Sequence, residues 1–266
     1  MPTTRNALPP EQTAQLVSIS IVSHRHGALV HDLLSDLERS CTGVEVLLTV
    51  NVEEALAFDP ASFAYPLKII RNARAKGFGA NHNAAFGHAA GGYYCVLNPD
   101  IRLNANPFPI LTQALRDRSI GVVAPRITSP SGETEDSARR FPTLGVIARK
   151  ALTGEQHHDY EVRSERLHPE WVAGMFMLFR SEVFRRLGGF DERYFLYYED
   201  VDLCLRLRRL GLEVVLEPGA EALHDARRAS RNSLRHLLWH VRSLTRFLIM
   251  KRRGESSRDL NETDGI

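Results

Sequence analysis

Acidic residues stand in two short segments where they could bind a metal or move a proton. Asp100 ends the sequence Asn98-Pro99-Asp100 after an apolar run, and Glu199, Asp200 and Asp202 follow an aromatic stretch. Carboxylate oxygens bind hard cations such as Mg²⁺ or Mn²⁺, and a carboxylate can take the proton of an attacking hydroxyl. Each segment also has a simpler interpretation, since Asn-Pro is a common turn and acidic residues stabilise the first turn of a helix.

The longest uncharged stretch, from Gly77 to Pro99, is rich in Gly, Asn and His. Glycine lets the backbone approach a ligand, while asparagine can either bind a diphosphate or cap the following helix. The segment lacks the spacing of a dinucleotide fingerprint and the ending of a P-loop. His24 and His224 each follow an apolar run, although an isolated histidine is also often structural.

These residues must be positioned by a sheet, because short β-branched runs alternate with helical patterns along the first hundred residues. The expected strands cover residues 16–22, 44–50, 67–70 and 93–97, with helices over residues 29–40 and 81–90. Strand, helix and strand in this order form a βαβ unit with a parallel sheet. The polar loops 23–27, 72–83 and 98–100 are therefore expected at the carboxyl ends of the strands, where ligands bind in open α/β sheets.

The second half continues this α/β pattern. The expected elements are a helix over 108–118, a strand over 121–124, a strand over 171–179, a helix from Ser181, a helix over 199–210 and a strand over 214–216. Residues 128–140 suggest a polar excursion or hairpin, whereas the weak periodicity of residues 150–168 predicts no particular structure.

Composition limits the protein class. The 266 residues include 43% hydrophobic and 25% charged side chains, with a formal net charge of +2, which is typical of a globular protein without general affinity for polyanions. Three widely spaced cysteines indicate neither a disulfide framework nor a CxxC site, and favour a reducing compartment. We expect neither a secretory signal near the start nor a membrane span, since no apolar run reaches about 18 residues.

Basic charge is concentrated near the C-terminus. Residues 227–253 contain nine Lys or Arg and no Asp or Glu, and leucines recur there at three- and four-residue steps. A basic amphipathic helix of this kind suits an anionic membrane surface. Packing against the core with a solvated basic face explains the same pattern. A nucleic-acid contact finds no recognition module in support, so we expect no nucleic-acid partner.

Several motifs occurring in order resemble those of family 2 nucleotide-sugar glycosyltransferases with the GT-A fold, and especially bacterial rhamnosyltransferases of O-antigen and cell-wall assembly. The resemblance covers roughly residues 17–253. It rests on Val22-Ser23-His24, Gly77-Phe78-Gly79 with Asn81 and Asn83, Leu97-Asn98-Pro99-Asp100, Arg140-Phe141-Pro142, Trp171 with Gly174, Gly188 to Cys204, and Trp239-His240 before Arg246-Phe247-Leu248.

The resemblance implies a metal-dependent, inverting sugar transfer. Asp200 would be the base that takes the acceptor proton, with Glu199 orienting the acceptor or pairing with a cation. Asp100 would bind Mg²⁺ or Mn²⁺, with His224 near the metal or diphosphate. The remaining expected contacts are Ser23, His24, Asn51, Gly77, Phe78, Asn83 and Asn98 for the donor, and Trp171, Gly174, Tyr198 and Asp202 for the acceptor.

The implied donor is dTDP-rhamnose, and the implied acceptor is a polyprenyl-diphosphate-linked saccharide. Two departures from the family pattern leave rival interpretations open. Asn98 replaces the first carboxylate of the Asp-x-Asp motif, and Val50 stands where many relatives have an Asp that contacts the nucleobase. Another donor such as UDP-GlcNAc or a UDP-hexose, or a degenerate sugar-nucleotide-binding subunit, therefore remains an alternative.

Four segments are expected. Residues 1–15 would be a flexible N-terminus, 16–225 a GT-A glycosyltransferase domain with a mostly parallel, Rossmann-like sheet and flanking helices, 226–253 the basic amphipathic helical segment and 254–266 a disordered tail. Such a protein would be cytoplasmic and peripheral, at the inner face of the cytoplasmic membrane.

Overall fold

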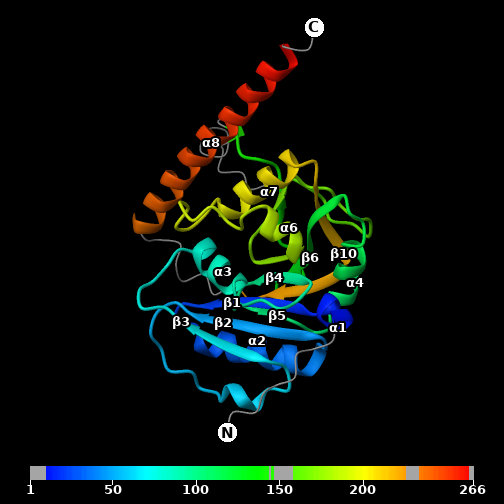
Figure 1. Cartoon of the computed structure of the whole chain (residues 1–266), viewed down its shortest axis with the longest axis vertical. Coiled ribbons are helices and arrows are strands. Elements are labelled where there is room, and N and C mark those ends of the chain that lie inside the picture. Colours follow the sequence, from blue (N-terminus) through cyan, green and yellow to red (C-terminus); the bar gives the residue numbers. More distant parts are fainter. Residues whose placement is uncertain (1–9, 144, 147–157, 226–233, 264–266) are drawn as a thin grey trace.

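The computed structural model describes residues 10–143, 145–146, 158–225 and 234–263, and is built around one large sheet (Figure 1). Its strands are β1 (Val17–Ser23), β2 (Val44–Val50), β3 (Leu67–Arg71), β4 (Tyr93–Leu97), β5 (Ile101–Arg102), β6 (Ile120–Thr128), β9 (Phe176–Arg180) and β10 (Glu213–His224). They form an eight-stranded sheet in the order β3-β2-β1-β4-β9-β6-β10-β5. A two-stranded sheet pairs β7 (Ala138–Arg139) with β8 (Trp171–Val172).

Helices cover both faces of the large sheet. They are α1 (Pro10–Gln15), α2 (Gly27–Ser40), α3 (Phe78–Phe86), α4 (Phe108–Ala114), α6 (Ser181–Arg186), α7 (Glu199–Arg209) and α8 (Leu234–Thr263), with a 3-10 turn, η1 (Pro60–Ser62). The apolar sides of α2 and α4 share one core with the sheet, whereas α3, α6 and α7 share the other. Figure 1 shows α2 on one side of the sheet and α6 and α7 on the opposite side. This is the predicted α/β architecture.

The carboxyl ends of the parallel strands meet at one edge. β1 pairs in parallel with both β2 and β4, and β2 pairs in parallel with β3. β9 runs antiparallel to β4, with Phe176 opposite Leu97, so β9 begins at the edge where β4 ends. The chain reverses its strand order around β1, and such a switch point leaves a crevice for a ligand.

The short strand β5 brings a distant histidine to this edge. β5 pairs antiparallel with the end of β10, with His224 opposite Ile101 and Leu223 opposite Arg102. The backbone N–H of Asp225 donates to the carbonyl of Asp100 at 2.9 Å. The end of β10 is therefore fixed beside the residue that precedes β5.

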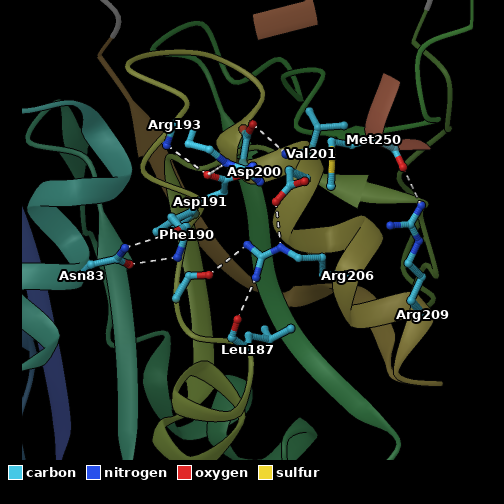
Figure 2. Close-up of polar contacts among 12 residues, drawn as sticks. Asn83, Leu187, Phe190, Asp191, Arg193, Asp200, Val201, Arg206, Arg209 and Met250 are labelled. Carbon is cyan, nitrogen blue, oxygen red and sulfur yellow. Dashed lines mark hydrogen bonds and ion pairs between the residues drawn. The ribbon is translucent and has the colours of Figure 1, made fainter. Parts of the chain in front are cut away.

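Helix α8 packs along the α7 side of the molecule (Figure 1). Phe247 is fully buried against Tyr194 and Val201. Arg209 at the end of α7 donates to the carbonyls of Met250 and Lys251, and Figure 2 draws its contact with Met250. Within the described part of the chain, no helix combines the length and the apolar character needed to cross a bilayer.

Several predicted boundaries differ from the structure. The single strand expected over residues 171–179 is divided into β8 and β9, because the Ala173 N–H donates to Ser137 beside β7 and the chain turns at Gly174. The helix expected over residues 81–90 begins earlier, at Phe78, and ends at Phe86 before Gly87. Glycine has low helix propensity, which accounts for the early end.

The chain ends also carry more helix than expected. Residues 10–15 of the predicted flexible N-terminus form α1, where Pro10 occupies the first position, a place that suits its fixed φ. The predicted tail is helical as far as Thr263. The predicted flexible residues 1–9, the start of the amphipathic segment at 226–233 and the tail residues 264–266 lie outside the described residues.

Candidate active site

A cavity of about 750 Å³ lies at the carboxyl edge of the sheet. Its size falls in the range of small-molecule sites. The three polar loops predicted to meet there do so, and residues before β9, the start of α7 and the start of α8 complete the walls. The lining includes His24, Asn51, Lys76, Phe78, Asn98, Asp100, Gly174, Glu199, Asp200, Arg235, His236 and Trp239.

Asp100 and His224 form one side of the site. His224 Nε2 lies 3.2 Å from Asp100 Oδ2, and its Nδ1 lies 2.7 Å from a Glu135 carboxylate oxygen. Burial alone would lower the pKa of His224, but the hydrogen bonds to Asp100 and Glu135 raise it to about 9. His224 itself does not line the cavity and reaches it through Asp100.

The donor set around Asp100 fits a divalent cation that a substrate helps to bind. Asp100 Oδ1 is buried and has no hydrogen-bond partner among the described residues. Among all the residues that the structure describes, no group of three or more His, Cys, Asp or Glu side chains is arranged to hold a metal. Mg²⁺ is often bound by one or two carboxylates together with substrate phosphates, and Asp100 can supply such a carboxylate.

Asp200 lies at the start of α7 and is oriented by backbone donors. The N–H groups of Gly174 and Val201 donate to its carboxylate, each at 2.9 Å. The carboxylate therefore has a fixed direction on the cavity wall.

Glu199 and Asp200 form a pair of neighbouring acids with shifted pKa values. Burial, reinforced by the charge of Asp200, raises the pKa of Glu199 well above its ordinary value. Burial also raises the pKa of Asp200, but the N–H groups of Gly174 and Val201 oppose this shift. Because these donors stabilise only the Asp200 carboxylate, protonation is favoured at Glu199 over Asp200.

Two tyrosines in an unusual backbone conformation precede this pair. Tyr197 and Tyr198 both have φ of 69°, a left-handed conformation that is uncommon for non-glycine residues. Contacts with α8 hold the turn: His236 Nδ1 lies 2.8 Å from the Tyr197 hydroxyl, and Ser243 Oγ donates to the Leu196 carbonyl at 2.9 Å. Helix α8 thus supports the turn that presents Asp200.

Asn51 organises the loop between β3 and α3. Its Oδ1 accepts from the Lys76 N–H at 2.8 Å and from Asn72 Nδ2 at 2.9 Å, while its Nδ2 donates to the Lys76 carbonyl at 3.0 Å. The Asn51 Nδ2 also lies 3.2 Å from His24 Nδ1. Asn51 lines the cavity, but these bonds use its hydrogen-bonding groups to position the backbone of Lys76.

Glu54 has the same role for the loop after β1. Its carboxylate accepts from the Ser23 hydroxyl and from the backbone N–H groups of Arg25 and Gly27 at 3.1 Å. Ser23 is fully buried, so it supports the loop and does not line the cavity. The neighbouring His24 does line the cavity. Burial lowers the pKa of His24, and the charges of His26 and Arg25 lower it further.

Some predicted site residues lie outside the cavity lining. They are Ser23, Gly77, Asn83, Trp171, Tyr198, Asp202 and His224. Asn83 exchanges hydrogen bonds with the backbone of Phe190, as Figure 2 shows. Trp171 Nε1 donates to the Arg140 carbonyl, and Asp202 pairs with Arg206 at 2.7 Å while almost fully buried.

Gly77 allows a close backbone contact beside the site. A Cβ at this position would lie 2.5 Å from the Phe195 carbonyl oxygen, closer than a real Cβ can approach. The adjacent Phe78 N–H donates to that same carbonyl at 2.9 Å. Gly77 therefore joins the start of α3 to the segment before α7.

Sequence reasoning missed several lining residues, above all Lys76, His82, Arg235, His236 and Trp239. His82 is buried against Phe78, with ring centroids 4.5 Å apart, and its Nδ1 lies 2.8 Å from Ser20 Oγ. Burial lowers the pKa of His82 to about 3, so its ring is neutral at pH 7. Its place in the uncharged stretch was a usable signal, whereas nothing local indicates that α8 returns to the site.

A family model described as "Glycosyltransferase like family 2" matches residues 14–247. Among curated proteins, the chain is 28% identical over 251 residues to rhamnosyltransferase WbbL of Escherichia coli (strain K12), covering 89% of this chain and 94% of that protein. It is 36% identical over 170 residues to N-acetylglucosaminyl-diphospho-decaprenol L-rhamnosyltransferase of Mycobacterium tuberculosis. That match covers 60% of this chain and 55% of the mycobacterial protein, so the chain spans about half of its length.

Solved structures show the same fold. The chain is similar to GalNAc-T7 with UDP, GalNAc and Mn²⁺, at a TM-score of 0.62 and 16% identity, over 80% of this chain and 44% of that one. It is also similar to the mannosyltransferase PcManGT of Pyrobaculum calidifontis with GDP-Man and Mn²⁺, at a TM-score of 0.56 and 15% identity, over 80% of this chain and 58% of that one. Both neighbours are GT-A glycosyltransferases with Mn²⁺ bound.

Proposed function

The chain belongs to glycosyltransferase-like family 2 and is a glycosyltransferase with the GT-A fold, and we propose that it transfers L-rhamnose from dTDP-rhamnose to a lipid-linked saccharide. One structural observation carries the chemistry. Asp100, with an unpartnered carboxylate oxygen, and Asp200, with a carboxylate oriented by backbone donors, line one cavity. A sugar-nucleotide transfer needs both parts, one toward the leaving diphosphate and the other toward the attacking hydroxyl.

In the proposed reaction, Asp200 accepts the proton of the acceptor hydroxyl as its oxygen attacks the anomeric carbon of the donor sugar. The carbon–oxygen bond to the diphosphate breaks on the opposite face, so the configuration inverts. Gly174 and Val201 keep the Asp200 carboxylate in one orientation during this step. The nearby Glu199 holds a proton, so it adds no second negative charge beside the base.

We propose that Asp100 and His224 hold Mg²⁺ or Mn²⁺ together with the diphosphate of the donor. The cation supplies charge that stabilises the leaving nucleoside diphosphate. Lys76 faces the same cavity and adds positive charge from the loop that Asn51 fixes. His224 must be neutral to bind a metal, so metal binding would release its proton.

Similarity to two rhamnosyltransferases supports the choice of donor. The nucleobase contact differs from the family pattern, since Val50 is buried in the core and Asn51 positions Lys76. The nucleobase would then be recognised by His24 and by backbone groups of the loops after β1 and β3. The mycobacterial relative, by its name, acts on a sugar linked through diphosphate to decaprenol, which supports a polyprenyl-diphosphate acceptor here.

A lipid-linked acceptor requires access to a membrane. Residues 234–253 of the predicted basic segment lie in α8, whose Arg235, His236 and Trp239 line the cavity. We therefore propose a cytoplasmic enzyme bound peripherally to the inner face of the cytoplasmic membrane.

A thermal-shift panel tests the donor assignment. The purified chain is mixed with dTDP-rhamnose, dTDP, UDP-GlcNAc, UDP-galactose or GDP-mannose, each with and without Mn²⁺, because a ligand of the native state raises the melting temperature. A metal-dependent rise confined to the dTDP compounds is expected. A rise with the UDP compounds would show that the donor is a UDP-sugar and not dTDP-rhamnose. No rise with any compound would favour a degenerate sugar-nucleotide-binding subunit.

A further inference from the structure

One face of α8 is apolar and exposed. Five of the eight exposed large hydrophobic residues in the described chain lie on this helix, at Leu234, Leu237, Leu238, Val241 and Ile249. Leu234 is 79% exposed and Leu238 is 70% exposed. Single exposed apolar residues are ordinary, but a continuous apolar stripe marks an interaction surface.

Arginines flank this apolar stripe. Arg235, Arg242 and Arg246 are seven and four residues apart and therefore lie along one side of the helix. No described acidic residue pairs with Arg235 or Arg242, and the sequence has no Asp or Glu between Leu234 and Arg253. This arrangement matches an anionic bilayer surface better than a second copy of α8, whose own arginines would repel these.

The same turns of α8 also form a wall of the cavity. Arg235, His236 and Trp239 line it, and the Arg235 guanidinium lies 4.7 Å from the centroid of the Trp239 ring. The indole in turn packs on Phe195, with ring centroids 4.8 Å apart. Arg235 forms no hydrogen bond with any described residue, so its N–H groups can bind a ligand. A guanidinium held in this way is suited to a phosphate group.

We propose that residues 234–241 of α8 form a subsite for the diphosphate of a membrane-held acceptor, with Arg235 binding the diphosphate while the apolar stripe lies in the bilayer surface. This inference rests on the proposed function, because it assumes a lipid-linked acceptor. The acceptor sugar must reach Asp200 inside the cavity while its lipid stays in the membrane. The diphosphate between them must then lie where the cavity wall meets the membrane-facing helix, which is the position of Arg235.

Arg242 provides a matched control for Arg235. Both are exposed arginines on the same side of α8, two helical turns apart, but only Arg235 lines the cavity. Arg235→Ala and Arg242→Ala therefore remove the same charge from the membrane-facing helix. A difference between them isolates the contribution of the cavity.

The first experiment measures sedimentation with vesicles that contain either phosphatidylglycerol and phosphatidylcholine or phosphatidylcholine alone. The unsubstituted chain is expected to bind the anionic vesicles preferentially. The double variant Leu237→Ser/Leu238→Ser is expected to bind them about tenfold more weakly, because it removes apolar area that would enter the bilayer. Equal vesicle binding by the double variant would overturn the membrane assignment. If the unsubstituted chain were a dimer and the double variant a monomer with the same vesicle binding, the apolar stripe would be an interface between two copies of the chain.

The second experiment measures calorimetric binding of farnesyl diphosphate, a short polyprenyl diphosphate, with farnesol as the control that lacks the diphosphate. Arg235→Ala is expected to weaken farnesyl diphosphate binding about tenfold, the scale of a lost charge-assisted hydrogen bond. Arg242→Ala is expected to leave it unchanged. An equal loss of farnesyl diphosphate binding in both variants would overturn the subsite. Displacement of farnesyl diphosphate by dTDP would also overturn it, because the diphosphate would then lie in the donor site.

Transfer kinetics separate the inference from the function on which it rests. Arg235→Ala should raise KM for a polyprenyl-diphosphate-linked acceptor and leave KM for the donor unchanged. An unsubstituted chain that binds farnesyl diphosphate through Arg235 but transfers no rhamnose would contradict the proposed function and support the subsite. A chain that transfers rhamnose equally well with Arg235 or Ala at this position would contradict the subsite alone.

Discussion

The backbone N–H of Gly174 donates to the carboxylate of Asp200 at 2.9 Å, across 26 positions of sequence. Gly174 lies between β8 and β9, and Asp200 lies in the first turn of α7. The bond therefore joins the sheet edge to the helix that carries the proposed base. It also stabilises the ionised form of Asp200, which a base requires.

Asp200→Asn should slow transfer strongly without unfolding the chain. The asparagine oxygen can still accept from Gly174, but the amide cannot take a proton, so kcat should fall about 100- to 10,000-fold. Donor affinity, measured by calorimetry with dTDP-rhamnose and Mn²⁺, should be unchanged. Asp191→Asn, at an acid outside the cavity lining that pairs with Arg193, is the control. Transfer by Asp200→Asn at the unsubstituted rate would exclude Asp200 as the base.

Glu199→Gln should have a much smaller effect than Asp200→Asn. Burial and the neighbouring Asp200 raise the pKa of Glu199, which favours the protonated form that glutamine mimics. We expect kcat to fall by less than about tenfold, below the range of a lost general base. In the unsubstituted chain and in Glu199→Gln, kcat should decline as the pH falls through the raised pKa of Asp200, because protonation removes the base. Losses of equal size in the two variants would show that Glu199 acts in its ionised form.

Asp100→Ala should weaken metal-dependent donor binding. The substitution removes the buried oxygen that has no described partner, and with it the carboxylate available to a cation. Calorimetry with dTDP-rhamnose should show that Mn²⁺ increases affinity for the unsubstituted chain but not for the variant. Asp59→Asn changes a carboxylate that caps the 3-10 turn η1 and should retain the response. A full Mn²⁺ response in Asp100→Ala would remove Asp100 from the metal site.

His82 should make stability depend on pH below neutrality. Its pKa is about 3 in the folded chain because burial disfavours the charged ring, whereas the unfolded value is 6.5. A lowered pKa means that the unfolded state binds more protons, so this contribution to stability is lost as pH falls below 6.5. Between pH 7 and pH 5 the loss amounts to about 2 kcal/mol.

Urea unfolding of the unsubstituted chain and of His82→Gln at several pH values measures this contribution. Their difference in unfolding free energy should shrink as pH falls, because glutamine does not titrate. His158→Gln, at an exposed histidine, should keep the pH dependence of the unsubstituted chain. A constant difference between His82→Gln and the unsubstituted chain from pH 7 to pH 5 would contradict a neutral His82.

Sequence patterns predicted the sheet and its functional edge because both depend on local information. Runs of β-branched residues and the polar loops after them indicated which strands end together, and the cavity lies there. Asp100 and Asp200 could be selected because each stands in a recognisable motif, Asp100 just after β4 and Asp200 at the start of α7. The same information could not determine the direction of Asp202, which pairs with Arg206 and is almost fully buried instead of facing the cavity.

The remaining parts of the site depend on contacts between distant segments. Glu54 holds the loop after β1 across 31 positions from Ser23, and Tyr197 contacts His236 across 39 positions. Such pairs leave no periodic trace in the sequence. The return of α8 to the cavity, on which the role proposed for Arg235 depends, is seen only in the folded chain.

Product analysis by mass spectrometry tests the proposed function most directly. The purified chain is incubated with Mn²⁺, polyprenyl-diphosphate-linked N-acetylglucosamine and an equimolar mixture of dTDP-rhamnose, UDP-GlcNAc and UDP-galactose. We expect a lipid-linked product extended by one rhamnose, and far less of it when Asp200→Asn replaces the unsubstituted chain. Extension by N-acetylglucosamine or galactose in place of rhamnose would contradict the proposed donor. Rhamnose transfer by Asp200→Asn at the rate of the unsubstituted chain would contradict the proposed mechanism.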